Sequence, residues 1–475
     1  MESSSRPSCG RGKLRRSGRR VRPAAAAALG LAGLALLSAC GERGDAGGGE
    51  RRPNVLFVLV DTLRRDHLQL HGYARPTSPA LDALAARSLV VERMYAQAPW
   101  TKPAVGSLFT SLYPRQHKAL GKSSANHLPA EVDTLAELLR RAGWATTGYS
   151  ENPHVQVETG FGQGFERFDG TPGFRSFTQG VVKHTVELLR GAHGRQPFFH
   201  YVHFLDPHGP YTPSERHRAE FVGARTTERD LVRRGRVGDL IGARDVPREP
   251  LSAADVDYLR ALYDAEIRSI DDALARILLV LAEEGLADDT LVVVTSDHGE
   301  EFLEHGGFKH GFRIHDELLR VPFLLHVPGA APRRLASTIV QQIDVAPTLL
   351  ELLGIPAPPE LQGRSFAGAL RGAELAPQPA IAECSWEGLD LRAIRTEEWK
   401  LILDGHGADM LFRVDRDPGE TENVIAQHPE VVAELTALME ERLGRYAGPD
   451  AASARGVRDQ GIEDAMDDLG YGGGE

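Results

Sequence analysis

Cysteine is nearly absent from this sequence. Only three cysteines, Cys9, Cys40 and Cys384, occur among 475 residues. That number is too small for the disulfide framework that holds small secreted domains together. We interpret Cys384 as a small buried hydrophobic residue. The overall composition, with 41% hydrophobic and 25% charged residues, is that of an ordinary globular protein with room for one large domain and a smaller one.

A long basic stripe is also missing. The chain has 55 Lys and Arg against 66 Asp and Glu, which gives a formal net charge of −11. Nucleic-acid-binding proteins need clustered positive charge, so this balance argues against nucleic acid as a partner. After residue 40 no apolar run is long enough to cross a membrane, and no internal repeat is visible.

The N-terminus has the pattern of a secretory signal. Residues 11–22 are basic, residues 24–37 are apolar, and Leu37-Ser38-Ala39-Cys40 ends the segment. This tetrad resembles the lipobox of bacterial lipoproteins, in which the cysteine is acylated. The resemblance implies a signal peptide over 1–40, lipidation of Cys40, and an exported lipoprotein of the bacterial cell envelope, in the periplasm or on the cell surface. The alternative is an uncleaved anchor helix.

The rest of the chain divides by composition. Residues 41–52 are Gly-rich and charged, and they predict a flexible tether. The acidic, Gly-rich residues 446–475 predict a disordered tail. Residues 214–250 are highly charged without a clear period, so we expect a surface insertion there.

Alternating strand and helix signals predict the fold class. Strands are expected over 54–60, 144–149, 197–204, 290–296 and 321–327, and helices over 78–88, 134–142, 180–191, 253–285 and 346–354. Such alternation indicates an α/β domain, over 53–378, with a mostly parallel central sheet flanked by helices. Four short strand signals and a final helix then predict a small antiparallel α+β subdomain over 379–445.

Two of the expected strands end on an aspartate. One apolar, β-branched run leads into Asp61, and another leads into Asp297 and His298. Buried parallel strands read as continuous apolar runs, and ligands of open α/β sheets gather past the carboxyl ends of the strands. Carboxylate and imidazole around a divalent ion can activate an oxygen nucleophile at neutral pH. The pattern therefore predicts a metal site.

A second segment carries a candidate nucleophile. In Thr101-Lys102-Pro103, the hydroxyl residue is followed by Pro and a helix-compatible run, so Thr101 is expected at a helix N-terminus. Backbone N–H groups and the helix dipole favour an anion there. Taken alone, the segment fits a simple helix cap equally well, because Ser and Thr are common at that position.

The motifs together resemble the sulfatase family of the alkaline phosphatase superfamily, in the expected order over residues 53–443. The matching segments are Val60-Asp61-Thr62-Leu63-Arg64, Trp100-Thr101-Lys102-Pro103, Asp206-Pro207-His208-Gly209-Pro210, Ser296-Asp297-His298-Gly299, Leu319-Arg320-Val321-Pro322 and Asp417-Pro418-Gly419-Glu420. The resemblance implies an alkaline phosphatase-like fold and hydrolysis of an anionic ester.

The resemblance also implies roles for individual residues. Asp61, Asp297, His298 and the side-chain oxygen of Thr101 would hold a divalent cation. His208 and His310 would contact the ester or protonate its leaving group, with His310 instead able to complete a second metal site. Lys102 and Asn152 are further candidates for substrate binding. For His208 a turn-stabilising role is an alternative. His305 and His315 are interpreted as solvated histidines or as residues that support the site without contacting the ester.

Departures from the family pattern alter the expected chemistry. Sulfatases that cleave sulfate esters carry Cys or Ser at position 101, which is oxidised to formylglycine, and Arg at position 105. This chain has Thr101 and Val105, and oxidation of threonine cannot give an aldehyde. The family's Gly-Lys-x-His element aligns with Ser150-Glu151-Asn152, and its second metal aspartate aligns with Thr62.

Three hypotheses follow from these departures. The first is a metal-dependent hydrolase of phosphate or sulfate esters, possibly glycan- or lipid-linked, with phosphate chemistry favoured and a covalent intermediate on Thr101. His298, directly after Asp297, favours Zn²⁺ or Mn²⁺ as the bound ion, with Ca²⁺ and Mg²⁺ as alternatives. The second is a transferase that passes a phosphoryl group to an envelope lipid or glycan. The third is a metal-binding lipoprotein without catalytic activity.

Overall fold

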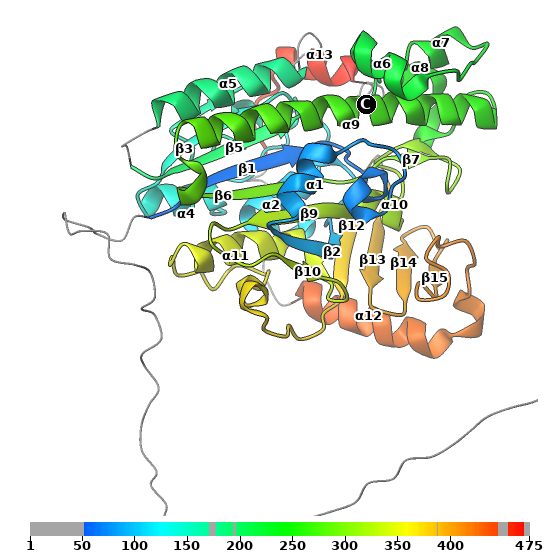
Figure 1. Cartoon of the computed structure of the whole chain (residues 1–475). Coiled ribbons are helices and arrows are strands. Elements are labelled where there is room, and N and C mark those ends of the chain that lie inside the picture. Colours follow the sequence, from blue (N-terminus) through cyan, green and yellow to red (C-terminus); the bar gives the residue numbers. More distant parts are fainter. Residues whose placement is uncertain (1–51, 171–176, 193–195, 387, 445–454, 470–475) are drawn as a thin grey trace, which may run out of the picture. The chain divides into compact units, whose positions relative to one another are not determined.

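A computed structural model describes residues 52–170, 177–192, 196–386, 388–444 and 455–469 (Figure 1). The expected signal peptide with Cys40, and the tether except Arg52, lie outside this part of the chain. Within it, no helix has both the length and the apolar character needed to span a bilayer.

A large mixed sheet forms the centre of the α/β part of the chain. Its strand order is β10-β2-β9-β6-β1-β5-β3-β4, and β11 also pairs with β2. Within this sheet, as far as the structure describes it, β9 is the one strand that runs antiparallel to its partners, β6 and β2. The strands are β1 Asn54–Val60, β2 Leu89–Tyr95, β3 Ala145–Ser150, β4 Arg167–Asp169, β5 Phe198–Phe204, β6 Thr290–Ser296, β9 Arg320–His326, β10 Arg333–Leu335 and β11 Val340–Gln341. The predicted fold class is confirmed.

Helices cover both faces of this sheet. Alternate residues of β1 enter two apolar clusters, with Val55 and Phe57 in one and Leu56 and Val58 in the other. The first face carries α2 Thr101–Thr110, α4 Leu135–Arg141 and α11 Val345–Leu352, and the second carries α1 Pro79–Ala85, α5 Phe177–Gly191 and α9 Ala253–Glu283. Burial of β1 on both faces explains its continuous apolar sequence.

Shorter elements complete the α/β part of the chain. They are the helices α3 Pro114–His117, α6 Glu215–Val222, α7 Asp230–Arg233, α8 Val237–Leu240 and α10 Asp316–Leu319, the hairpin strands β7 Glu301–Phe302 and β8 Phe308–Lys309, and the 3₁₀ turns η1 Arg65–His67, η2 Gln69–His71, η3 Val157–Thr159, η4 Ala243–Asp245, η5 Ala287–Asp289, η6 Gln342–Asp344 and η7 Ala367–Arg371. The expected irregular insertion over 214–250 thus contains three short helices. Each buries only one to three residues, such as Phe221 or Val232, which is too few to give a period in the sequence.

The predicted small antiparallel sheet near the C-terminus is confirmed. A four-stranded antiparallel sheet has the order β12-β13-β14-β15, with strands Ala380–Cys384, Leu391–Arg395, Lys400–Asp404 and Met410–Phe412. Turn η8 Ile425–Gln427 leads into α12 Pro429–Gly444, which Figure 1 shows running across this sheet. Leu435, Met439 and Leu443 of α12 pack against Ile394 and Leu401 of the sheet.

The prediction of a disordered acidic tail is wrong for residues 455–469. Residues Gln460–Asp468 form helix α13, which Asp459 caps by accepting a hydrogen bond from the Ile462 N–H. Ile462 and Met466 are buried, while Glu463 accepts hydrogen bonds from Ser123 and Ser124. The composition is misleading because the acidic residues alternate with apolar ones that form the buried face of a short amphipathic helix.

Candidate active site

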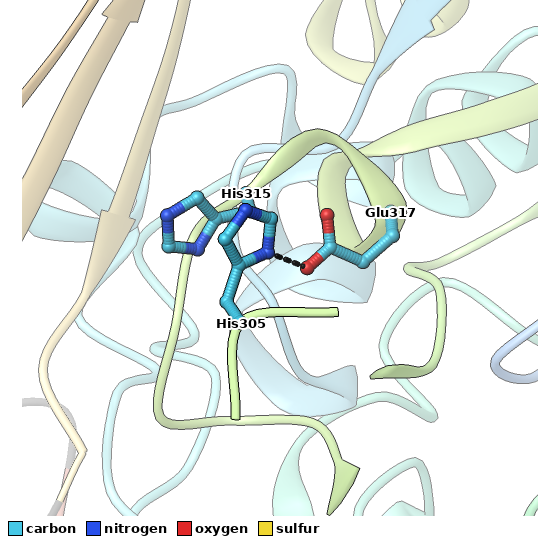
Figure 2. Close-up of side chains that lie close together, drawn as sticks. All are labelled: His305, His315 and Glu317. Atoms are coloured by element: carbon cyan, nitrogen blue, oxygen red, sulfur yellow. Dashed lines mark hydrogen bonds and ion pairs between the residues drawn. The ribbon is translucent and has the colours of Figure 1, made fainter. Parts of the chain in front are cut away.

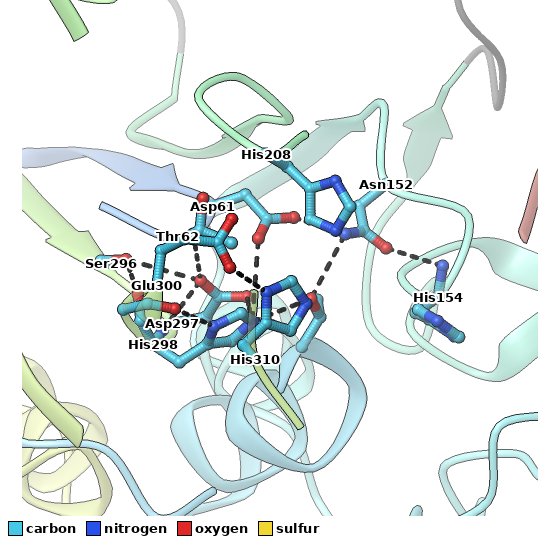
Figure 3. Close-up of polar contacts among 12 residues, drawn as sticks. Asp61, Thr62, Asn152, His154, His208, Ser296, Asp297, His298, Glu300 and His310 are labelled. Atoms are coloured by element: carbon cyan, nitrogen blue, oxygen red, sulfur yellow. Dashed lines mark hydrogen bonds and ion pairs between the residues drawn. The ribbon is translucent and has the colours of Figure 1, made fainter. Parts of the chain in front are cut away.

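The candidate site lies where four neighbouring parallel strands end. Strands β6, β1, β5 and β3 are adjacent in the sheet. Directly after the ends of β6 and β1 come Asp297 and Asp61. One residue separates Asn152 from the end of β3, and His203 is the penultimate residue of β5. Figure 3 shows Asp61, Asp297, His298 and His310 converging, with Asn152 and His208 beside them. The topology therefore brings together residues that are far apart in the sequence.

The turn after β1 is fixed to the end of β6. Thr62 adopts a left-handed backbone conformation with φ of 52°. Its N–H donates to Asp297 Oδ1 at 3.2 Å, and the Leu63 N–H donates to Ser296 Oγ at 2.9 Å. From α9, the Tyr263 hydroxyl donates to the Thr62 carbonyl at 2.7 Å. These bonds hold the backbone that positions the two aspartates.

The chemistry of the donor set fits a divalent cation. Asp61 and Asp297 are fully buried, and Asp61 Oδ1 and Asp297 Oδ2 have no hydrogen-bond partner among the described residues. Burial and the neighbouring Asp297 carboxylate raise the pKa of Asp61 well above its usual range. A bound cation removes the cost of placing two carboxylates side by side in a buried site.

His298 is oriented as a ligand toward the same place. Its Nδ1 lies 2.9 Å from the Gly299 carbonyl oxygen, which can only accept, so Nδ1 carries the proton and Nε2 presents its lone pair. The Nε2 atom lies 3.3 Å from Asp297 Oδ2 and 3.7 Å from Asp61 Oδ1. The structure thus brings together the predicted ligands Asp61, Asp297 and His298.

Thr101 joins this group from the start of α2. The residue before it, Trp100, occupies the cap position, so Thr101 is the first helical residue and the simple cap interpretation is not supported. Thr101 Oγ1 lies 3.3 Å from His298 Nε2. The Asn152 amide donates to Thr101 Oγ1 at 3.4 Å and to Asp61 Oδ2 at 2.5 Å. Asn152 therefore faces both the hydroxyl and the carboxylate.

Two further histidines lie over this group. The ring centroid of His310 is 4.4 Å from that of His298 and 5.0 Å from that of His208. Nδ1 of His310 lies 2.8 Å from Glu300 Oε1, and Nδ1 of His208 lies 2.7 Å from the Gly209 carbonyl. Burial lowers the pKa of both rings well below the usual histidine value. Both predicted residues are therefore in the cluster, with their ring orientations fixed.

Glu300 is a member of the site that the sequence analysis missed. Burial raises its pKa to about 7. One carboxylate oxygen faces His310, and the other accepts from the Tyr211 hydroxyl at 2.9 Å. The only feature of the sequence that could have indicated Glu300 as a site residue is its position directly after His298-Gly299. The second residue missed is His203, whose contacts are described below.

The structure places Lys102 away from the cluster. Its ammonium group donates to the carbonyl oxygens of Lys122, Ser123 and Asn126 at 3.4, 2.8 and 3.1 Å. Burial lowers its pKa to about 7. Three carbonyl acceptors use all three donors of an ammonium group, so Lys102 supports the loop 122–126 instead of contacting an ester.

Comparison with known proteins agrees with this geometry. The family model described as Sulfatase matches residues 53–355, which is more than half of the chain. The chain belongs to the sulfatase family. A second model, N-sulphoglucosamine sulphohydrolase, C-terminal, matches residues 303–447.

Individual sulfatases match over different lengths. Arylsulfatase K of Bos taurus is 33% identical over 196 residues, which cover 38% of this chain and 36% of that protein. Choline-sulfatase of Rhizobium meliloti is 26% identical over 464 residues, covering 83% of this chain and 87% of the relative. The crystal structure of a phosphonate monoester hydrolase of Agrobacterium radiobacter has a TM-score of 0.69 and 24% identity, covering 82% and 96% of the two chains. The relatives are ester hydrolases, and we assign the chain to this class of enzyme.

His305, His315 and Glu317 form a second cluster (Figure 2). The rings of His305 and His315 stack with centroids 3.6 Å apart and planes at 7°. Nδ1 of His305 lies 2.7 Å from Glu317 Oε1, and Nε2 lies 3.1 and 3.2 Å from the Gly419 and Glu420 carbonyls. Both ring nitrogens of His305 face acceptors. An imidazole binds a metal in the plane of its ring, so an ion in the plane of one stacked ring would lie outside the plane of the other. We interpret this cluster as a structural tie to the C-terminal subdomain.

This tie predicts a pH-dependent stability. Burial alone would lower the pKa of His305, but the hydrogen bond and charge of Glu317 raise it above the usual value. A raised histidine pKa gives stability that is complete below about pH 6.5 and is lost as pH rises through the folded-state pKa. We expect His305→Gln to flatten the decline in unfolding free energy above that pH, measured by urea denaturation. The exposed His406 is the control, since His406→Gln should retain the wild-type slope; an unchanged slope in His305→Gln would refute the tie.

Proposed function

We propose that this sulfatase-family enzyme hydrolyses phosphate esters, with Thr101 as the nucleophile and a covalent Thr101 intermediate. The observation that carries the proposal is the position of Thr101 Oγ1, 3.3 Å from His298 Nε2 at the centre of the buried ligand group. A threonine cannot yield the aldehyde that sulfate-ester cleavage uses in the family. Thr and Ser hydroxyls are suitable nucleophiles for phosphoryl transfer when a cation and a helix N-terminus offset the charge.

The residues have separate roles in this mechanism. Asp61, Asp297 and His298 would hold the divalent cation, which when bound lowers the pKa of a hydroxyl and offsets the charge of the ester. Thr101 Oγ1 loses its proton to solvent and attacks phosphorus. The Oγ1–P bond forms while the P–O bond to the leaving group breaks, and the leaving oxygen takes up a proton. The positions of His208 and His310 support contact with the ester and its leaving group.

The second half of the reaction restores the enzyme. Water attacks the phosphothreonine, its oxygen bonds to phosphorus, and the Oγ1–P bond breaks. Inorganic phosphate leaves, and Thr101 regains its hydroxyl proton. The Asn152 amide, which donates to both Thr101 Oγ1 and Asp61 Oδ2, would hold these two oxygens in place beside the ester in both halves.

The relatives support both ester classes. The family and choline-sulfatase indicate sulfate esters, whereas the phosphonate monoester hydrolase that shares the fold is named for a phosphorus ester. Thr101 is the feature of this chain that favours phosphorus. The substrate we propose is a small anionic ester, including glycan- or lipid-linked ones.

A panel of nitrophenyl esters tests this proposal. The purified protein is assayed with phosphate monoester, phosphate diester, phosphonate and sulfate, each with Zn²⁺, Mn²⁺, Mg²⁺ and Ca²⁺. We expect a phosphorus ester to be cleaved fastest, with Zn²⁺ or Mn²⁺. Preferential cleavage of the sulfate with Ca²⁺ would overturn the phosphate assignment. Inactivity on every ester, with release of nitrophenol only when an alcohol acceptor is added, would instead identify the transferase alternative.

A further inference from the structure

Strand β5 contains two buried histidines whose surroundings differ. His200 and His203 are three residues apart, so their side chains point to opposite faces of the sheet. His200 Nδ1 lies 2.8 Å from Thr147 Oγ1 and its Nε2 lies 3.3 Å from Thr185 Oγ1. Both nitrogens of His200 are therefore satisfied by hydroxyl groups. His200 has the environment of a structural core histidine.

His203 has a partner on one side only. Its Nδ1 lies 3.3 Å from Ser150 Oγ, whereas its Nε2 is fully buried without a hydrogen-bond partner in the described part of the chain. Leaving a buried polar atom unpaired costs about 1–3 kcal/mol. The nearest charged group to this nitrogen is a carboxylate of the site, with Asp61 Oδ2 at 3.8 Å.

That distance is too long for a hydrogen bond but fits two ligands of one ion. Hydrogen bonds to carboxylates are about 2.7–3.2 Å long. Two ligand atoms each about 2.1 Å from a metal lie roughly 3.0–4.0 Å apart, for angles between 90° and 140°. One ligand atom each from Asp61, His203 and Asp297 all lie within 4.8 Å of one another. The three side chains thus face one region of the site.

We propose that His203 Nε2 is a metal ligand that completes the site together with Asp61 and Asp297. The inference rests on the proposed function in one respect, namely that the site holds a divalent cation. Thr62 stands where the family has its second metal aspartate, so this chain has one carboxylate fewer on the loop after β1. His203 supplies the missing donor from the neighbouring strand β5, which pairs with β1 in register Leu59 to His203.

This exchange has a consequence for metal selectivity. Replacing a carboxylate by an imidazole lowers the negative charge of the site and adds a second nitrogen donor beside His298. Ca²⁺ and Mg²⁺ prefer oxygen ligands, whereas Zn²⁺ and other transition ions accept imidazole readily. The site is therefore selective for a transition metal ion.

Metal binding by matched variants tests the proposal. Metal-free wild type, His203→Asn and His200→Asn are titrated with Zn²⁺, Mn²⁺ or Ca²⁺ alone, and bound metal is measured after equilibrium dialysis. We expect His203→Asn to bind Zn²⁺ at least about 100-fold more weakly, because loss of a supporting residue alone costs 10–100-fold. Ca²⁺ binding should change less, and His200→Asn should bind both ions as wild type does. Wild-type Zn²⁺ affinity in a folded His203→Asn variant would overturn the inference.

A measurement on the wild-type protein covers the case in which the variant does not fold. Pulsed EPR of the Mn²⁺-loaded protein, grown with ¹⁵N-histidine, detects imidazole nitrogens bound to the ion. Two coupled imidazoles are expected, and one would refute the role of His203. Binding of no divalent cation would refute the proposed function as well, whereas cation binding and Thr101-dependent turnover with a single imidazole would refute only this inference.

Discussion

Replacing Thr101 by alanine is expected to lower kcat/KM for the preferred ester by at least about 10³-fold. The reason is that alanine removes the attacking oxygen, whereas the ligand group around Asp61, Asp297 and His298 keeps its own hydrogen bonds. Thr101→Ser should retain part of the activity, because serine keeps the hydroxyl at the same place on α2. The measurement is steady-state kinetics with the nitrophenyl panel.

Thr110→Ala is the matched control for this substitution. Thr110 is also a buried threonine of α2, but its hydroxyl donates to the Gly106 carbonyl at 2.7 Å, at the far end of the helix. Its loss should change stability slightly and leave kcat/KM within about twofold of wild type. Unchanged turnover in Thr101→Ala would remove Thr101 as the nucleophile and would favour direct attack by water.

Trapping the intermediate separates the two kinds of ester chemistry. Rapid acid quenching with a ³²P-labelled ester should leave label on the peptide that contains Thr101, and the label should be absent from Thr101→Ala. Quenching with a ³⁵S-labelled sulfate ester should leave none. A protein that binds Zn²⁺ but gives neither turnover nor label would support the non-catalytic hypothesis.

The sequence predicts the fold well wherever a strand is buried on both faces. Strands β1, β5 and β6 are continuous apolar runs, and each was located to within one residue. Strand β2 was missed because Glu92 and Arg93 interrupt its apolar run. Helix α13 was missed because five acidic residues over 459–468 outweigh its buried Ile462, Ala465 and Met466 in composition. The signal ending in Cys40 stays a prediction, since it lies outside the described residues.

The candidate site was predictable to the extent that motifs mark it. Asp61, Thr101, Asp297 and His298 were predicted from strand ends and family motifs, and they lie together in the structure. Lys102 was assigned from its charge and its place next to Thr101, but a side chain at the next helical position points about 100° away. His203 could not be predicted, because a histidine in a buried strand is more often a satisfied core residue, as His200 is. Only the three-dimensional spacing distinguishes the two.

Substituting Lys400 by methionine is expected to destabilise the C-terminal subdomain by about 3–5 kcal/mol. Lys400 is fully buried at the start of β14, and its ammonium group donates to Asp316 at 2.9 Å and to Glu420 at 2.8 and 3.0 Å. Methionine keeps the volume but leaves two carboxylates without their shared cation. Urea denaturation followed by circular dichroism measures the loss.

Two further variants show whether charge causes this loss. Lys400→Met combined with Glu420→Gln should recover part of the stability, because Glu420 is then neutral, whereas Asp316 keeps its ion pair with Arg395 at 3.5 Å. Glu440→Gln removes an ion pair of the same subdomain, Arg392 to Glu440 at 2.6 Å, in which Glu440 is 52% exposed, and it should cost less than about 1 kcal/mol. A Lys400→Met loss as small as that of Glu440→Gln would contradict the prediction.

The same buried group connects the subdomain to the candidate site. Asp316 begins α10, and the Leu318 carbonyl of this helix accepts from the Gly299 N–H at 2.7 Å, one residue after His298. Because Tyr95 and Arg395 also contact Asp316, the helix keeps part of its support when Lys400 is lost. Lys400→Met should therefore unfold at lower urea concentration but retain wild-type Zn²⁺ affinity while it is folded. A parallel loss of metal affinity in the folded variant would instead indicate that this ion group also positions His298.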